Sequence, residues 1–577
     1  MTVTTIATSP KPSASEILKE RDPTLAGTIA QTLADAQSDH FVEDDTQFLK
    51  FHGIYQQDDR DLRKTGKKYM FMVRCRIPGG VLTPAQYLAC DDLATRYANN
   101  TLRVTSRQGF QFHGVAKGGL RALVKALNEA LLGTLAACGD NIRNVMAPPT
   151  PAINQLGQQV QEHARQVAAA VLPSTRAYHS IWIEGVPLDL QDPANQHFVD
   201  PLYGQTYLPR KFKIAFVIPP LNDIDIFTNC CGFIAIADGN GKLCGYNLLA
   251  GGGMGRSHGK VETFPRLADV IGFVPPDKVV DVARAVLTIH RDFGDRSNRR
   301  HARLKYVLED RGAPWFREEL ERRVGFRLAE PMPFRFEKQG DAFGWNQQVD
   351  GRLFLSLFVE TGRVRDRDGW RMKTALREGV ARYQPEILLT PSNNVILANL
   401  AAAQREEITR LFAEHGVQTE PERQGGIVRR ASMACVALPT CGVALAEAER
   451  CLPDLITRLE GLLAEVGLGG QEITIRMTGC PNGCARPYVA EVGLVGKAPG
   501  RYQIWLGGNE ACTRLNRLYR DMVKDPDIVA ELRPLFARYA QGRLREERFG
   551  DWAARVLWAE QREAARPAPT VADASSQ

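Results

Sequence analysis

The sequence predicts an α+β protein built as a pseudo-twofold duplication. Residues 79–130 and 361–416 carry the same order of expected elements, which is helix, strand, strand and helix. GDNIRNVMAPP follows the first copy, RRASMACVALPTCG follows the second, and each leads into a longer α/β stretch. A duplicated chain of this kind tends to form a cleft between its halves, where ligands commonly bind. The alternative is a chance similarity between two ordinary α+β segments.

The two copies share their turn chemistry. The first reads GGVLTPAQYLACDDLATRYANNTLRVTSRQGFQFHGV, in which the expected strands flank a T-S turn. The second ends on ARYQPEILLTPSNNVILANLAAAQREEITRLFAEHG, in which the strands flank a T-P turn. Alternating apolar residues on both sides of each turn predict paired strands.

The stretch between the copies predicts strands followed by helices. Residues 203–250 contain the strand-like runs KIAFVIPP, DIDIF and CGFIAIADGNGKLCGYNLLA, and ADGNGK is typical of a hairpin turn. Residues 276–325 have a helical period, and the first helix opens on a Pro-Asp start.

Both ends of the chain are polar. The N-terminus, MTVTTIATSPKPSASEILKERDP, lacks the apolar core of a signal peptide, so we expect a mobile arm over residues 1–44. The ending AARPAPTVADASSQ predicts disorder over residues 563–577. The sequence contains no run of about 18 apolar residues, so it predicts no transmembrane helix. Twelve cysteines in an unexported chain favour reduced thiols, and we expect a cytoplasmic protein.

The overall charge does not point to nucleic acid. The 577 residues carry a net charge of +7, which is small for this length. A basic pocket for an anion explains the excess equally well. We therefore expect neither a nucleic-acid nor a membrane partner.

Two short-spaced cysteine pairs predict a metal centre. Cys435 and Cys441 lie in ACVALPTCG, and Cys480 and Cys484 lie in TGCPNGCARPY. Four thiolates in two pairs suit a 4Fe-4S cluster or a tetrahedral zinc ion. The apolar residues between the first two cysteines favour a buried cluster. The tight turn through Pro481, Asn482 and Gly483 directs backbone N–H groups toward the sulfurs. Four unrelated thiols remain a third alternative.

Basic side chains recur within apolar, strand-like segments. Each alone is typical of a solvated charge, but a buried cation needs an anionic partner, so together they predict a polyanionic ligand. On a strand, Gln111 and His113 would share one face, and so would Lys211 and Lys213. The candidates are Arg74, Arg103, Arg107, Gln111, His113, Arg143, Arg210, Lys211, Lys213, and the cluster Arg299, Arg300, His301 and Arg303.

At this point the chain resembles one family over nearly its whole length, from about residue 45 to about residue 560. ACVALPTCG with TGCPNGCARPYVAEVGLVGKAPGRY resembles the siroheme and 4Fe-4S signature of sulfite and nitrite reductases. KFHGIYQQDDRD, RCRIPGGVLTP, RVTSRQGFQFHG, YGQTYLPRKFK and GGGMGRSH resemble assimilatory sulfite reductase hemoproteins. These enzymes serve sulfate assimilation and cysteine biosynthesis.

The resemblance implies a division of the chain. Paired ferredoxin-like halves accompany two α/β sulfite/nitrite reductase domains. The expected segments are the arm 1–44, a ferredoxin-like half 45–130, an α/β domain 131–330, a second half 331–422, a second α/β domain 423–562 with the cysteines, and the tail 563–577.

The resemblance also implies roles for residues. All four cysteines would bind the cluster, and Cys484 would also ligate the siroheme iron. The substrate anion would contact Arg74, Arg143, Lys211 and Lys213. Siroheme, whose eight carboxylates explain so many cations, would contact Arg103, Arg107, Gln111, His113, Arg210 and Arg303.

The implied reaction is the six-electron reduction of sulfite to sulfide. The sequence contains no flavin or NADPH module, so electrons would come from a partner. QQDDRD and VGKAPGRY favour an NADPH-dependent flavoprotein, whereas CARPY, YQIWLGG and LAACGDNIRNVMAPP are more similar to ferredoxin-dependent enzymes. A ferredoxin-dependent nitrite reductase and a zinc-stabilised nucleic-acid-binding protein remain the alternatives.

Overall fold

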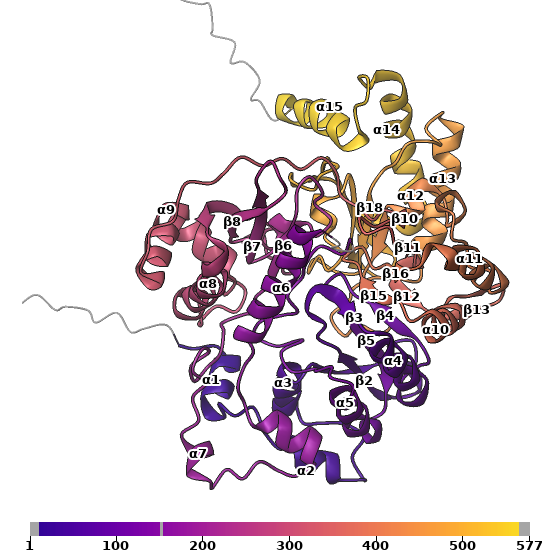
Figure 1. Cartoon of the computed structure of the whole chain (residues 1–577). Helices are drawn as coiled ribbons and strands as arrows, with labels where there is room; N and C mark the ends of the chain where they lie inside the picture. The colour runs from indigo at the N-terminus through magenta and orange to yellow at the C-terminus, as the bar shows by residue number, and fades with distance from the viewer. Residues whose placement is uncertain (1–10, 151–153, 565–577) are drawn as a thin grey trace, which may run out of the picture.

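The computed structural model describes residues 11–150 and 154–564, and two five-stranded antiparallel sheets lie at its centre (Figure 1). Their strand orders are β1–β2–β5–β4–β12 and β10–β11–β16–β15–β3. The two orders correspond position by position, which gives the pseudo-twofold symmetry that the repeat predicts. The strands of the first sheet are β1 (Ile54–Asp58), β2 (Tyr69–Arg74), β5 (Phe110–Val115), β4 (Leu102–Val104) and β12 (Arg363–Val364). Those of the second are β10 (Gly344–Gln347), β11 (Leu353–Leu357), β16 (Val395–Leu400), β15 (Glu386–Leu389) and β3 (Val81–Leu82).

Each copy contains the predicted order of helix, strand, strand and helix. The helices of the first copy are α4 (Pro84–Tyr97) and α5 (Leu120–Glu129), and those of the second are α10 (Met372–Tyr383) and α11 (Arg405–Glu414). The sequence TPAQ begins α4, because the Thr83 hydroxyl oxygen accepts a hydrogen bond from the Gln86 N–H and the Gln86 side-chain oxygen accepts one from the Thr83 N–H. A hairpin of β13 (Asp366–Arg367) and β14 (Trp370–Arg371) precedes α10.

The two halves exchange one short strand each. β3 belongs to the first copy but pairs with β15, and β12 belongs to the second copy but pairs with β4. Strands of two residues are too short to be predicted from alternation. The exchange joins the halves through main-chain hydrogen bonds.

Equivalent turns also bond across the pseudo-twofold axis. The Gln108 side chain donates to the Leu389 carbonyl at 3.0 Å, and the Asn393 side chain donates to the Val104 carbonyl at 3.0 Å. Gln108 and Asn393 both adopt positive φ values, 52° and 74°. The axis therefore runs between the T-S turn and the T-P turn.

The two α/β domains also repeat one pattern. The sheet β6–β7–β8–β9 begins with a parallel pair, and the sheet β17–β18–β19–β20–β21 begins with two; both end with antiparallel pairs. The first domain contains α6 (Gln155–Ala170), α7 (Pro193–Gln196), β6 (Ile214–Val217), β7 (Cys231–Ala237), β8 (Leu243–Ala250), β9 (Asp269–Val274), α8 (Val279–Phe293) and α9 (Leu304–Val324). The second contains α12 (Ile427–Arg430), β17 (Ser432–Ala434), α13 (Leu452–Glu465), β18 (Ile475–Thr478), β19 (Val492–Ala498), β20 (Arg501–Leu506), β21 (Arg517–Lys524), α14 (Ile528–Gly542) and α15 (Phe549–Ala564).

One predicted strand of the first α/β domain is wrong. ADGNGK forms the hairpin between β7 and β8, but DIDIF forms a turn and a short 3-10 helix, Ile226–Thr228. Asp225 there has a positive φ of 51° and is fully buried against two arginines. Ion pairing with distant residues overrides the local apolar alternation.

The N-terminal arm is folded where the structure describes it. α1 (Ala14–Arg21), α2 (Ile29–Ala34) and α3 (Glu43–Phe51) pack at the base of the molecule (Figure 1), and Leu25, Ile29 and Phe41 are buried. The expectation of a mobile arm over 1–44 is therefore wrong for residues 11–44. Residues 1–10 and the tail from 565 lie outside the described residues. No described helix has the length and apolar character needed to cross a membrane.

Candidate active site

A cavity of about 450 Å³ lies where the parts of the molecule meet. Its wall takes residues from α1 and α3, from β2, β5 and the T-S turn, and from the segments around Asp140 and Lys211. The second half contributes Asn393, and the second α/β domain contributes the cysteine segments. The wall includes every predicted site residue except Arg303. The duplicated halves therefore enclose the cleft that the repeat predicted.

The four cysteines lie at the ends of two neighbouring parallel strands. β17 ends directly before Cys435, and β18 ends two residues before Cys480. Because the strands pair in parallel, their carboxyl ends meet at one edge of the sheet. The Gly479 N–H donates a hydrogen bond to the Cys435 sulfur at 3.3 Å, although Gly479 precedes the turn through Pro481, Asn482 and Gly483 for which such bonds were expected. The fold thus brings both cysteine pairs to the same cavity.

The four thiols are not equivalent. Cys480 is buried, Cys435 and Cys441 are partly buried, and Cys484 is exposed on the cavity wall. Burial, with the neighbouring Cys484, raises the pKa of Cys480 to about 12, and burial raises the pKa of Cys435 well above its ordinary value. Thiolates at these positions therefore need a metal cation to offset burial.

The four cysteines provide the ligands that a 4Fe-4S cluster requires. Such a cluster takes four cysteine thiolates, and all four residues line this one cavity. A tetrahedral zinc ion would take the same number of thiolates.

Arg74 and Arg143 come together although 68 positions separate them in the chain. Both guanidinium groups donate to the Ala137 carbonyl, at 3.4 and 3.1 Å. Arg74 also contacts the Cys138 sulfur at 2.9 Å. Neither arginine forms an ion pair with any described carboxylate. Two cations held in place by neutral partners form a site for an anion.

Lys211 and Lys213 face the cavity, while Phe212 between them is buried. Burial, with the neighbouring Arg210, lowers the pKa of Lys211 to about 7. Burial, with the neighbouring Arg107, lowers the pKa of Lys213 well below its ordinary value. Within the described chain neither ammonium has a hydrogen-bond or ion-pair partner. An anion beside them would raise both pKa values, and each lysine could then donate a proton near neutral pH.

Gln111 and His113 share one face of β5 and both line the cavity, as the strand period predicted. Burial and the nearby Arg363 lower the pKa of His113 well below its ordinary value, so its imidazole is neutral. The Arg363 guanidinium lies 2.9 Å from the His113 Nδ1 atom. His113 therefore offers a hydrogen bond rather than a charge.

Arg103 has an anionic partner that the sequence did not reveal. Its Nε atom lies 3.1 Å from the Glu449 carboxylate, which also pairs with Arg363 at 2.7 Å. Burial opposes ionisation of Glu449, but Arg363 and Arg103 together lower its pKa to about 2. Part of the Arg103 charge is thus neutralised within the protein.

A second network of charges on the cavity wall centres on Asp140. Asp140 pairs with Arg299 at 2.7 Å, Arg210 at 3.5 Å and Lys19 at 3.8 Å. Burial opposes its ionisation, but Lys19 and Arg299 hold the pKa of Asp140 well below its ordinary value. The basic cluster at 299–303 pointed to Arg299, whereas nothing in the local sequence of the arm singled out Lys19. Lys50 lines the same wall.

Arg107 and Arg303 are held by neutral groups. Arg107 donates to the Asn144 carbonyl at 2.6 Å and to the Asn229 side chain at 2.9 Å. Arg303 is not among the residues that line the cavity, and it approaches the Cys230 sulfur at 3.7 Å. In the described part of the chain, the buried Nε atoms of Arg107, Arg143 and Arg303 lack hydrogen-bond partners. Unpartnered cationic donors of this kind fit a ligand with many carboxylates.

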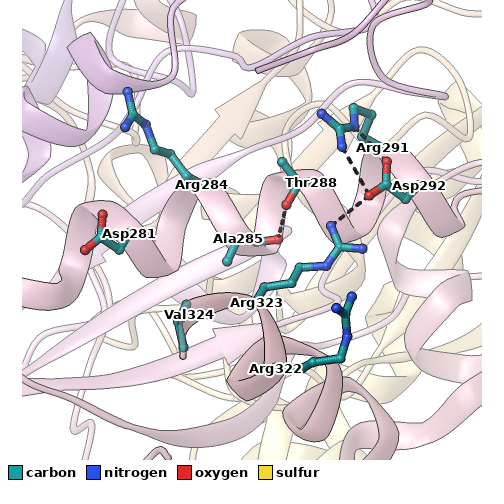
Figure 2. A pocket seen from close by; sticks show the side chains of 9 residues that line it. All are labelled: Asp281, Arg284, Ala285, Thr288, Arg291, Asp292, Arg322, Arg323 and Val324. Atoms are coloured by element: carbon teal, nitrogen blue, oxygen red, sulfur yellow. Dashed lines mark hydrogen bonds and ion pairs between the residues drawn. The ribbon is translucent and has the colours of Figure 1, made fainter. Parts of the chain in front are cut away.

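A separate hollow of about 490 Å³ lies between α8 and α9 (Figure 2). Arg291 and Arg323 both reach Asp292, at 2.7 and 2.8 Å. Arg322 and Arg323 also pair with Glu319. These arginines are satisfied within the protein, and none of the predicted site residues lines this hollow.

Two family models match the chain. The nitrite/sulfite reductase ferredoxin-like half domain matches residues 63–130, and the nitrite and sulphite reductase 4Fe-4S domain matches residues 162–328. A protein of Myxococcus xanthus (strain DK1622), named sulfite reductase (NADPH) hemoprotein beta-component, is 48% identical over 95% of this chain and 97% of its own length. The chain belongs to the siroheme sulfite and nitrite reductase family.

Further comparisons agree with this membership. A protein of Geobacillus kaustophilus (strain HTA426) with the same name is 48% identical over 94% of this chain and 96% of its own length. The solved structure of the Mycobacterium tuberculosis NirA protein shares the fold, with a TM-score of 0.76 and 24% identity over 94% of this chain and 97% of NirA. The 4Fe-4S model matches the first α/β domain, while the four cysteines lie in the second.

Proposed function

We propose that this protein reduces sulfite to sulfide with six electrons, at a siroheme that a cysteine thiolate couples to a 4Fe-4S cluster. The observation that carries the proposal is the single cavity, which combines four cysteine thiols with a wall of arginines and lysines. Relatives named as sulfite reductase hemoproteins over nearly the full chain support it. We also propose that the domains of the chain begin at residues 45, 131, 331 and 423. All twelve cysteines are free, which favours a reducing compartment, and we propose the cytoplasm.

The bound groups and the chain divide the chemistry. When bound, siroheme supplies the iron that binds sulfite through sulfur, and the cluster supplies electrons singly. Arg74 and Arg143 hold the sulfite oxygens, and Lys211 and Lys213 hold them and donate protons. The overall change is SO3(2−) + 6e(−) + 7H(+) → HS(−) + 3H2O, in which each oxygen leaves as water.

The remaining predicted residues would hold the siroheme. Its carboxylates would pair with Arg107, Arg210 and Arg103. Arg103 remains available because Glu449 is one carboxylate shared between two arginines, Arg103 and Arg363. Gln111 and the neutral His113 would donate hydrogen bonds at the cavity wall. Arg303, which does not line the cavity, is the one predicted siroheme contact that would need the ligand to extend beyond these lining residues.

Nitrite reduction is the alternative within the same family. It uses the same cofactors, and the paired lysines favour the doubly charged sulfite over singly charged nitrite. Comparison of kcat/KM for the two anions, with a reduced viologen as donor, tests this choice. We expect a preference for sulfite, and a large preference for nitrite would overturn the assignment. A colourless protein with zinc and no iron would overturn both.

The electron donor would be an NADPH-dependent flavoprotein, with ferredoxin as the alternative. The loop 59–68 between β1 and β2 lies against the first cysteine segment, since Arg60 donates to the Ala444 carbonyl at 2.5 Å. Val443 beside Cys441 is 63% exposed. Exposed Lys64, Lys67 and Lys68 form no ion pair among the described residues, so this surface suits an acidic partner.

Charge reversal on this loop tests the docking surface. In the triple variant Lys64→Glu, Lys67→Glu and Lys68→Glu, we expect kcat/KM for the flavoprotein donor to fall about tenfold at low salt. Turnover with a reduced viologen should be unchanged, because a small donor needs no docking. Lys242→Glu, on an exposed hairpin, is the control. Donor-dependent rates that match the wild type would remove this loop from the interface.

A further inference from the structure

Arg486 contacts all four repeated units of the molecule. It belongs to the second α/β domain, follows Cys484 by two residues, and is almost fully buried. Its Nε atom donates to Asp225 of the first α/β domain. Its Nη1 and Nη2 atoms donate to the carbonyls of Ser106 and Pro391, each at 3.1 Å.

The two carbonyls are equivalent under the pseudo-twofold symmetry. Ser106 follows the first residue of the T-S turn, and Pro391 holds the same place in the T-P turn. These are the turns that Gln108 and Asn393 tie together across the axis. Arg486 therefore lies at the pseudo-twofold axis and bonds symmetrically to both halves.

The same contacts bear on Cys484. The Ser106 hydroxyl donates to the Cys484 carbonyl at 3.0 Å, while Arg486 holds the Ser106 carbonyl. Arg476 donates to Asp225 at 2.6 Å and approaches the Arg486 carbonyl at 3.5 Å. The Cys484 carbonyl is thus held by Ser106 of the first half, and the chain two residues later is held by Arg476 of its own domain and through the Arg486 side chain by the other three units.

The group also carries a net charge. Arg476 and Arg486 share one carboxylate, Asp225, and all three side chains are 5% exposed or less. Burial opposes ionisation of Asp225, but Arg476 and Arg486 lower its pKa, so the group bears one uncompensated positive charge. A buried charge acts over a longer range than a solvated one.

We propose that Arg486 is a positioning residue, which fixes the Cys484 segment at the pseudo-twofold axis and whose charge favours the reduced state of the cluster. The inference rests on the proposed function, because it requires that Cys484 bind the cluster. It assigns no contact between Arg486 and substrate. It explains why an arginine with a positive φ of 55° stands two residues after Cys484.

The test is a redox titration of the cluster, followed by electron paramagnetic resonance, in Arg486→Met and Arg486→Lys holoenzyme. Methionine removes the net charge, so we expect the ratio of reduced to oxidised cluster at a fixed potential to fall about tenfold, or about 59 mV for one electron. Lysine keeps the charge but cannot reach Asp225, Ser106 and Pro391 at once. It should stay within about twofold of wild type in that ratio.

Arg548→Met is the matched control, because Arg548 is a largely buried arginine of the same domain that pairs with Glu491 at 2.8 Å. It should lower stability and leave the potential unchanged. Ser106→Ala, which removes only the bond to Cys484, should fold and alter the visible spectrum of the bound siroheme. Wild-type potential in Arg486→Met and a wild-type spectrum in Ser106→Ala would together overturn the inference. A wild-type protein without a cluster would instead overturn the proposed function.

Discussion

Replacement of Cys484 by serine is expected to lower sulfite turnover about 10³-fold or more, equivalent to about 4 kcal/mol of transition-state stabilisation. Cys484 is the thiol exposed on the cavity wall, whereas Cys480 is buried. By the resemblance to the family, its sulfur would belong to both the cluster and the siroheme. A serine oxygen is a poor substitute for this shared thiolate.

The controls are the same cysteine-to-serine changes at Cys435, Cys441 and Cys480. Iron and acid-labile sulfide per chain, together with the visible spectrum, should show that Cys484→Ser keeps more cluster iron than the other three variants while it loses the siroheme signal. Equal and total loss of both cofactors in all four variants would contradict a special role for Cys484.

The second large effect is expected at the paired lysines. Lys211→Met and Lys213→Met should each lower kcat/KM for sulfite by about 10²–10⁴-fold, because each removes a cation and a proton donor from the anion site. Lysine-to-arginine changes separate the two roles. Arginine keeps the charge but hardly releases a proton, so KM should stay near wild type while kcat falls.

Stability gives an independent measurement on the same variants. Neither lysine has an anionic partner among the described residues, and burial lowers both pKa values. Methionine at either position should therefore leave the cofactor-free protein as stable or more stable. Lys117→Met is the control, because Lys117 is buried against the Thr32 and Asp35 carbonyls, outside the cavity. It should lower stability and leave kcat unchanged. Wild-type kcat in both Lys211→Met and Lys213→Met would contradict the proposed proton donors.

The duplicated core could be predicted from the local sequence pattern. Neighbouring residues determine the alternating strands around the T-S and T-P turns and the amphipathic helices beside them. Both copies fold as predicted. The exchanged strands β3 and β12 have two residues each, so no alternation marks them. Their pairing is decided by the symmetry of the assembled halves.

The sequence did not predict which charged side chains are buried. The segment around Lys19 reads as polar and solvated, yet Glu16 and Lys19 are buried because Arg296 and Asp140 meet them from distant positions. DIDIF has the alternation of a strand, but Asp225 turns inward to two arginines. Such pairings join residues far apart in the chain, and a single sequence does not reveal them.

The candidate site was predictable because its residue types are unusual for their surroundings. Cysteine pairs at short spacing, and cations within apolar strands, have few structural explanations, and the fold gathers them around one cavity. The carboxylates that neutralise some of these cations were missed. Glu449 and Asp140 lie in ordinary polar segments, and only the structure shows that they face Arg103 and Arg210.

The most direct test of the central claim is the number of electrons consumed per sulfide formed. The purified protein would be supplied with sulfite and a reduced viologen, and both viologen oxidation and sulfide would be measured. The account predicts six electrons for each sulfide, with no partly reduced sulfur product. Viologen oxidation without sulfide, or no oxidation by a protein with its full iron content, would contradict it.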